Sequence, residues 1–189
     1  MPSSFSQFEI DFKSLLSALI GYYILCCLWT FLCIYFEEFS AVDTGLVTGA
    51  GYLLIFSFSL WNGGGDKSLI TFLKVTLLTT IIFLFASFGI SLLVAFFSDN
   101  VWAYYILNSL FVSAGYVFFL DQLFNIEKKG FITLASTLLL LLHYYLLTKD
   151  LIFLRFTLQL HDRLIMFILF QGFLIIPLMI GLRIKGKSN

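Results

Sequence analysis

The stretch from Gly51 to Phe97 most constrains the fold, because it consists of two apolar segments joined by a short polar loop. The loop, Asn62 to Lys67, holds three consecutive glycines beside one acid and one base. The second segment is mostly apolar from Val75 to Phe97, which exceeds the roughly 20 residues that a helix needs to cross about 30 Å of hydrocarbon. We therefore predict a membrane hairpin, and we expect any recognition by this protein to involve the polar loop.

The composition extends this conclusion to the whole chain. Of the 189 residues, 60% are hydrophobic and 12% are charged, whereas soluble domains are about 45 to 50% apolar and about 25% charged. The eleven basic and eleven acidic residues cancel, which excludes a nucleic-acid-binding function driven by phosphate contacts. A second, water-soluble domain has no room in a chain of this length.

We predict an all-α, polytopic integral membrane protein with one domain, residues 1–189, and six transmembrane helices. The region from His143 to Arg163 admits three arrangements: it could lie along the outer interface, dip back into the membrane, or extend the fifth span. The predicted spans are 15–36, 45–61, 69–97, 101–124, 131–147 and 164–184.

The lysines and arginines indicate the orientation, because short loops rich in these residues stay on the cytoplasmic side. With six spans, eight bases fall on one side and three on the other, so both termini are predicted to be inside. The inner bases are Lys13, Lys67, Lys74, Lys128, Lys129, Arg183, Lys185 and Lys187, and the outer ones are Lys149, Arg155 and Arg163.

Cys26, Cys27 and Cys33 all fall in the first apolar segment, where neighbours on one helix cannot reach disulfide geometry. We interpret them as small packing residues. Glu9 and Asp11 precede that segment without a basic start or a small-residue cleavage site, so no removable signal peptide is expected.

Two patterns resemble catalytic sites. The run from Gly63 to Asp66 matches the GxGD pattern of intramembrane aspartyl proteases, in which two carboxylates share a proton. That chemistry needs a second acid on the same side of the membrane. However, Asp43 lies across a predicted span from Asp66, and Asp121 comes after Asp66 in the chain, which reverses the order of the two acids in these proteases. Arg155 and His161 fit a loose spacing of RNA-cleaving domains, but they are embedded in apolar sequence. We therefore predict no enzyme and no catalytic residue.

Four ionisable positions within or beside apolar sequence also need an interpretation. Asp121 lies about a turn from the inner end of the fourth span, so it should face protein or a water-filled cavity, or else pair with a nearby lysine at the interface. Arg155 and Asp162 are two further polar positions near the membrane. His143 has no second ligand at metal spacing, so we expect a hydrogen-bonded packing residue and predict no metal or cofactor.

Several segments are similar to motifs of one known family. The opening FSQFEIDFKSLL is similar to an amphipathic start of the type HLxELRxRL, with Asp11 to Lys13 in place of Glu-Leu-Arg. LLIFSFSLWN looks like LYQxWxF, and Asp66-Lys67 occupies the place of an inner-loop acid followed by bases. AGYVFFLDQL looks like FGxxFExPxxL, and the last span carries Pro177-Leu178. Over nearly the whole chain, these segments resemble TatC, the multi-spanning receptor of the twin-arginine protein translocase.

The chain also departs from the TatC pattern. The prolines of PGLY and PPD are missing, and the long first outer loop is almost gone. Phe119 stands where the family has an intramembrane Glu, two positions before Asp121. Two positions turn a helix by about 200°, so Asp121 can replace that Glu only if the helix register differs.

The resemblance implies a non-catalytic receptor that binds twin-arginine signal peptides and assembles with single-span, TatA-like partners into an oligomer. It places the protein in a bacterial or mitochondrial inner membrane. Asp66 would be the primary contact to the peptide, Glu9, Asp11 and Lys67 would assist it, and Asp121 would line the receiving cavity. The alternatives are an accessory or channel subunit of a larger membrane complex and, third, a solute transporter.

Overall fold

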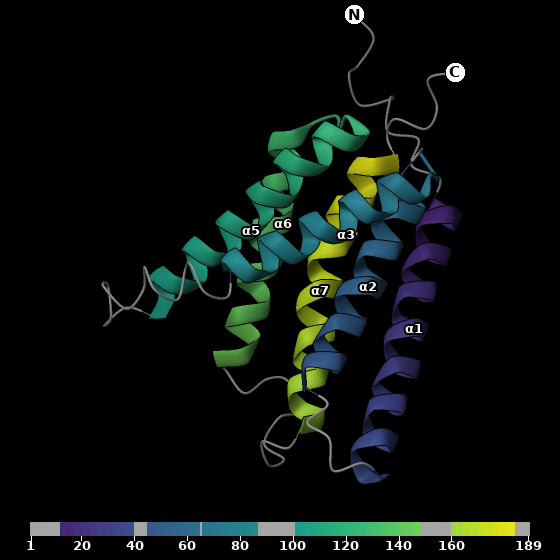
Figure 1. Cartoon of the computed structure of the whole chain (residues 1–189). Helices are drawn as coiled ribbons and strands as arrows, with labels where there is room; N and C mark the ends of the chain where they lie inside the picture. The colour runs from purple at the N-terminus through teal and green to yellow at the C-terminus, as the bar shows by residue number, and fades with distance from the viewer. Residues whose placement is uncertain (1–11, 40–44, 65, 87–100, 149–159, 184–189) are drawn as a thin grey trace, which may run out of the picture.

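Every element that the computed structural model describes is an α-helix (Figure 1). The described residues are 12–39, 45–64, 66–86, 101–148 and 160–183. Within them the all-α prediction is confirmed, and the predicted fourth span coincides with α5. The elements are α1 (Phe12–Phe39), α2 (Gly45–Gly63), α3 (Leu69–Leu84), α5 (Val101–Phe124), α6 (Lys129–Thr148) and α7 (Leu160–Arg183).

The other predicted boundaries differ modestly from the observed helices. α1, α2 and α6 extend beyond the predicted spans at one or both ends, and α7 begins four residues before 164. Most of the second half of the predicted third span lies outside the described residues. The ambiguous region from His143 to Arg163 is divided: α6 continues to Thr148, α7 begins at Leu160, and residues 149–159 are not described.

Successive helices run in alternating directions along a bundle (Figure 1). α1 begins and α7 ends at the same end, where α2 is also joined to α3 and α5 to α6; we call this the basic end. α7 occupies the middle, because it contacts α1, α2, α5 and α6. The start of α1 and the end of α7 therefore lie at the same end of the bundle.

The sequence forms helices because a helix satisfies its own backbone hydrogen bonds in an apolar setting. Hydroxyl groups within the apolar helices also bond to the preceding turn: Thr76 Oγ1 donates to Phe72 O at 3.0 Å, and Ser57 Oγ donates to Leu53 O at 2.7 Å. Among the described residues, three helical segments are long and apolar enough to cross a membrane: Leu15–Tyr35, Trp102–Phe124 and Lys129–Leu146.

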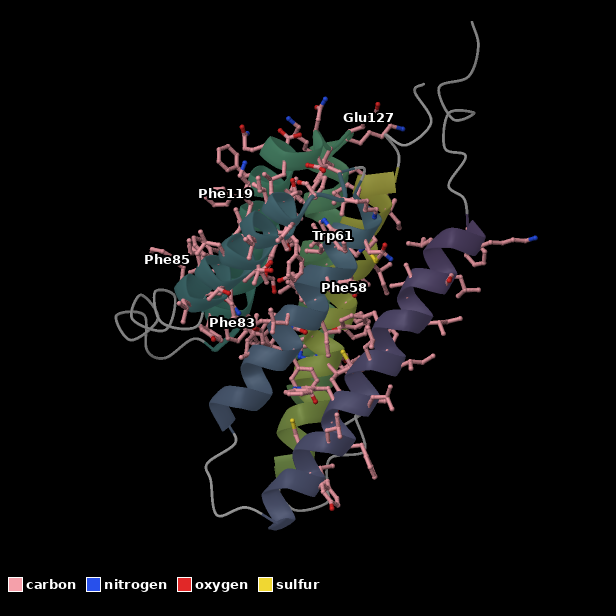
Figure 2. All side chains as sticks on the ribbon, turned by 45° about the vertical axis from the view of Figure 1, so that its right-hand side comes forward. Phe58, Trp61, Phe83, Phe85, Phe119 and Glu127 are labelled. Carbon is pink, nitrogen blue, oxygen red and sulfur yellow. The ribbon has the colours of Figure 1, made fainter. Side chains whose placement is uncertain are left out.

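The helices bury one set of apolar side chains and expose another. Leu174, Ile175 and Leu178 of α7 are buried in the centre of the bundle. Large apolar side chains also cover the outer faces, where Phe85 and Phe119 project away from the bundle (Figure 2). An outer surface of this kind is expected where helices meet lipid tails, which are as apolar as the side chains.

α1 packs against α2 at a glycine. A Cβ atom added at Gly51 would lie 2.1 Å from the Trp29 ring, so only glycine permits this approach. At the next residue of each helix, the hydroxyls of Thr30 and Tyr52 are 2.5 Å apart and share a hydrogen bond between the helices. α1 also carries three cysteines: Cys26 and Cys33 are buried and Cys27 is exposed. All three are free thiols, so the prediction that they form no disulfide is confirmed.

The α2–α3 loop is held against the end of α5. A Cβ atom added at Gly64 would lie 2.2 Å from the Phe124 ring. The described glycines all have negative φ, so Gly64 is required for close approach and not for a left-handed backbone. In the neighbouring α5–α6 turn, Asn125 and Lys128 do adopt positive φ, at 51° and 53°. The two loops of the basic end therefore pack together.

Candidate functional site

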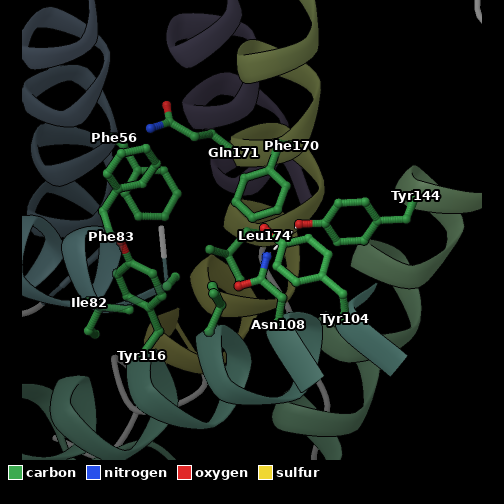
Figure 3. A pocket seen from close by; sticks show the side chains of 12 residues that line it. Phe56, Ile82, Phe83, Tyr104, Asn108, Tyr116, Tyr144, Phe170, Gln171 and Leu174 are labelled. Carbon is green, nitrogen blue, oxygen red and sulfur yellow. Dashed lines mark hydrogen bonds between the residues drawn. The ribbon is translucent and has the colours of Figure 1, made fainter. Parts of the chain in front are cut away.

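A cavity of about 190 Å³ lies inside the bundle, between α2, α3, α5, α6 and α7 (Figure 3). It lies close to the middle of α7, since Gln171 is the twelfth of the 24 residues of that helix. Half of its twelve lining residues are aromatic. The lining residues are Phe56, Ile82, Phe83, Ala86, Tyr104, Asn108, Val112, Tyr116, Tyr144, Phe170, Gln171 and Leu174.

Asn108 is the central polar group of this cavity. Its side chain lies between Leu174 and the Tyr104 ring (Figure 3) and is only 4% exposed. Its Nδ2 donates to the hydroxyl of Tyr144 at 2.5 Å, whereas its Oδ1 is buried and has no hydrogen-bond partner. A buried acceptor without a partner costs about 1 to 3 kcal/mol, so it favours an added donor.

Gln171 supplies a second amide from the opposite wall. Its Oε1 accepts a hydrogen bond from the Tyr22 hydroxyl at 3.3 Å, which links α7 to α1. The amide extends toward Phe56 in Figure 3. Tyr116 donates to Thr79 O at 3.4 Å. The cavity thus combines hydrogen-bonding groups on separate helices.

Ring contacts hold the aromatic wall in place. Tyr105 stacks on Tyr144 with ring centroids 4.3 Å apart and planes 11° apart. Phe56 meets Tyr116 edge to face at 5.4 Å, and Phe170 meets Tyr144 at 6.1 Å. Each such pair contributes about 0.5 to 1.5 kcal/mol beyond area burial. The wall is therefore a preformed surface for a flat apolar group.

His143 lies behind this wall as a packing residue, as predicted. It is buried, and its ring meets Phe170 edge to face at 5.6 Å and Phe173 at 6.1 Å. Its Nδ1 has no hydrogen-bond partner, so the predicted hydrogen bond is not formed at that atom. Within the described part of the chain, no group of three His, Cys, Asp or Glu residues could hold a metal ion.

Asp66 is exposed at the basic end, where it binds Ser68, the N-cap residue of α3. Its Oδ1 accepts from Ser68 N at 2.9 Å, and its Oδ2 accepts from Thr71 Oγ1 at 2.5 Å and from Ser68 Oγ at 3.1 Å. The hydrogen bond from Thr71, followed by that from the Ser68 backbone, lowers the pKa of Asp66. The carboxylate is therefore ionised at neutral pH and already has local partners.

Lys67 turns back onto the end of α2. Its Nζ donates to Trp61 O at 3.2 Å, to Asn62 O, and to Asn62 Oδ1 at 3.3 Å. The ammonium also lies 5.5 Å from the centre of the Trp61 ring. A cation at these carbonyls complements the negative end of the helix dipole. Both charged residues of the predicted recognition loop thus stabilise helix ends.

Asp121 pairs with a lysine, which was one of its two predicted environments. Its Oδ2 lies 2.6 Å from Lys129 Nζ, and the two side chains are 13% and 54% exposed, respectively. Its Oδ1 accepts from Ile126 N at 2.8 Å. The carboxylate therefore closes the α5–α6 turn, and it does not line the central cavity.

The two carboxylates of the GxGD hypothesis thus have separate partners: Asp66 is bound by Ser68 and Thr71, and Asp121 by Lys129. This arrangement differs from a pair that shares one proton. Of the other predicted site residues, Glu9, Asp11 and Arg155 lie outside the described residues, and Asp162 is in the first turn of α7, at the end opposite to Asp66.

Sequence reasoning missed the central cavity because it considered only ionisable residues inside the spans. The available signal was neutral: Asn108 and Gln171 are amides in mostly apolar stretches of their helices. Their nearness could not be predicted, because it depends on how the helices are rotated. Comparisons of the chain with protein-family models, curated proteins and solved structures found no match.

Proposed function

We propose that the chain is a six-span, non-catalytic integral membrane protein that binds a small ring-bearing molecule in its central cavity. The alternating helices and their shared basic end support six spans. Among the described residues, one base, Arg163, lies at the opposite end, as expected if the basic end faces inward. The described lysines and arginines at the basic end are Lys13, Lys67, Lys74, Lys128, Lys129 and Arg183.

The unpartnered Oδ1 of Asn108 carries the proposal of a binding function. A mid-membrane cavity with aromatic walls and few polar groups is the usual form of a small-molecule site. The 190 Å³ volume slightly exceeds that of an apolar cavity known to hold benzene, about 150 Å³. The best-fitting ligand is therefore one ring with one hydrogen-bond donor.

Two fluorinated probes test this function. 4-Fluorophenol and fluorobenzene have similar shapes, but only the phenol can donate to Asn108 Oδ1. Fluorine NMR of the protein in nanodiscs should detect binding of both and a preference of about five- to tenfold for the phenol, the effect of one hydrogen bond worth about 1 kcal/mol.

The matched variants are Asn108→Leu and Gln122→Leu, because both remove an amide from α5 and only Asn108 lines the cavity. The first should abolish the preference for the phenol, and the second should retain it. Ala86→Leu adds volume at the cavity wall and should weaken both probes. If Ala86→Leu binds both probes as the parent does, the cavity is not their site.

A second candidate is the TatC-like receptor for twin-arginine signal peptides, with single-span partners. It is favoured by one observation: Asp66 is an exposed, ionised carboxylate at the proposed inner end. Arginine pairs well with carboxylates because its guanidinium group presents a fixed fork of donors. The alternative role is that of an accessory or channel subunit of a larger membrane complex. In that case the protein should co-purify with unrelated membrane complexes after gentle detergent extraction.

Asp66→Asn tests the receptor more cleanly than charge reversal, because asparagine still has a side-chain oxygen that can accept from Ser68 or Thr71 while it removes the charge. Capture of a twin-arginine peptide should fall about tenfold or more. Glu127→Gln is the control, since Glu127 is another exposed acid at the basic end (Figure 2). Equal capture by the parent and Asp66→Asn would remove this candidate without affecting the cavity.

A further inference from the structure

A groove of about 450 Å³ runs between α1 and α2 near the basic end. It is separate from the central cavity except for the α1–α7 contact of Tyr22. Phe58, on the side of α2 that faces α1 in Figure 2, forms part of its apolar wall. The groove is lined by Ser17, Ala18, Gly21, Tyr22, Leu25, Phe58, Ser59, Asn62 and Lys67.

The floor of the groove on α1 is open. A Cβ atom added at Gly21 would meet nothing within 4 Å. Ser17, Gly21 and Leu25 follow one another at four-residue spacing, so they form one row along the helix. Toward the basic end the same row continues to Lys13, which is exposed. The row on α1 therefore runs from apolar Leu25 to polar Ser17 within the groove, and the charge of Lys13 lies one turn beyond it.

Lys67 brings a second positive charge to this rim. Its ammonium is held above the groove by the carbonyls of Trp61 and Asn62, as described above. Asn62 and Ser17, both exposed, bring neutral polar groups beside it. Lys67 on a polar rim, with Lys13 one turn beyond Ser17 and an apolar channel along Gly21 and Leu25, complements a phosphate that carries a hydrocarbon chain.

We propose that this groove binds an anionic phospholipid, with its phosphate between Lys13 and Lys67 and one acyl chain along Gly21 and Leu25. The half-apolar lining favours a lipid over a free phosphate ion. The inference rests on the proposal that α1 and α2 cross a bilayer, but it is independent of what the central cavity binds. It assigns the α2–α3 loop a role in lipid contact at the inner leaflet.

Native mass spectrometry of the protein with phosphatidylglycerol and phosphatidylcholine tests the proposal. The parent should retain phosphatidylglycerol preferentially. Lys67→Gln and Lys13→Gln should each reduce that retention about fivefold, the expected effect of one basic residue near an anionic headgroup. Lys13 is not involved in closing the α2–α3 loop, so its variant is informative even if Lys67→Gln disturbs the fold.

Lys74→Gln is the matched control, because Lys74 is exposed on α3 and does not line the groove. It should leave retention unchanged. Gly21→Phe should displace both lipids, since the ring would fill the open floor. Equal losses in the Lys74 and Lys67 variants would overturn the site in favour of general surface charge, and displacement of the lipid by inorganic phosphate would overturn the lipid assignment. If alkaline extraction releases the protein from membranes, the proposal that α1 and α2 cross the bilayer is itself refuted.

Discussion

Polar side chains have different kinds of partner at the basic end and in the middle of the bundle. At the basic end, Asp66, Lys67 and Asp121 all bind neighbours within eight residues and hold turns or helix ends. In the middle, Asn108 reaches Tyr144 on another helix and still has an unpartnered oxygen. The charged side chains of Asp66, Lys67 and Asp121 therefore organise the connections at the basic end, whereas the buried amide of Asn108 retains an acceptor without a partner.

The largest effect should come from Gly64, where the two loops of the basic end meet. Gly64→Val should lower the free energy of unfolding by about 3 kcal/mol, because its Cβ would overlap the Phe124 ring. Unfolding in mixed detergent and sodium dodecyl sulfate measures the change. Gly130→Val is the control, since a Cβ there would meet nothing within 4 Å. A tolerated Gly64→Val would contradict the close packing of the loops.

Substitution of Asp121 should give the next largest decrease in the free energy of unfolding. Asp121→Ala should cost about 2 kcal/mol, because Ile126 N and Lys129 both lose their partner in a half-buried turn. The same unfolding assay applies. Asp121→Asn retains an acceptor for Ile126 N and should cost about half as much. A full loss in both variants would assign the effect to the ion pair alone.

Asp66 should give a smaller and pH-dependent effect. Its pKa is lower in the folded protein than in the unfolded chain, where it is about 3.9. Its contribution to stability is therefore fully present above about pH 4 and is lost as the pH falls through the lower folded pKa. Unfolding midpoints measured between about pH 2 and pH 6 should fall less steeply for Asp66→Asn. Parallel curves for the parent and the variant would show that the Ser68 and Thr71 bonds do not stabilise α3.

The smallest change in the free energy of unfolding should come from a double substitution in the central cavity. The double variant Asn108→Leu with Tyr144→Phe removes both partners of a buried hydrogen bond together with the unpartnered oxygen. Replacing both partners by apolar groups is nearly neutral, so the free energy of unfolding should change by less than about 1 kcal/mol. A loss as large as that of Asp121→Ala would mean that Asn108 is structural, as the polar groups of the basic end are.

The sequence alone predicted the helical class and most helix positions, including the bounds of α5. Long apolar runs permit few structures, because each backbone group needs a partner inside its own segment. It also predicted the pairing of Asp121 with a nearby lysine as one alternative, since both residues border the same short turn.

Only the tertiary structure decided which faces of the helices meet. The contact of Gly64 with Phe124 and that of Asn108 with Tyr144 join residues far apart in the chain. These contacts depend on the rotation and tilt of each helix, and helices that are apolar on every side specify neither from sequence. The same freedom concealed the central cavity, because its wall is assembled from five helices whose individual sequences show only scattered aromatic residues and amides.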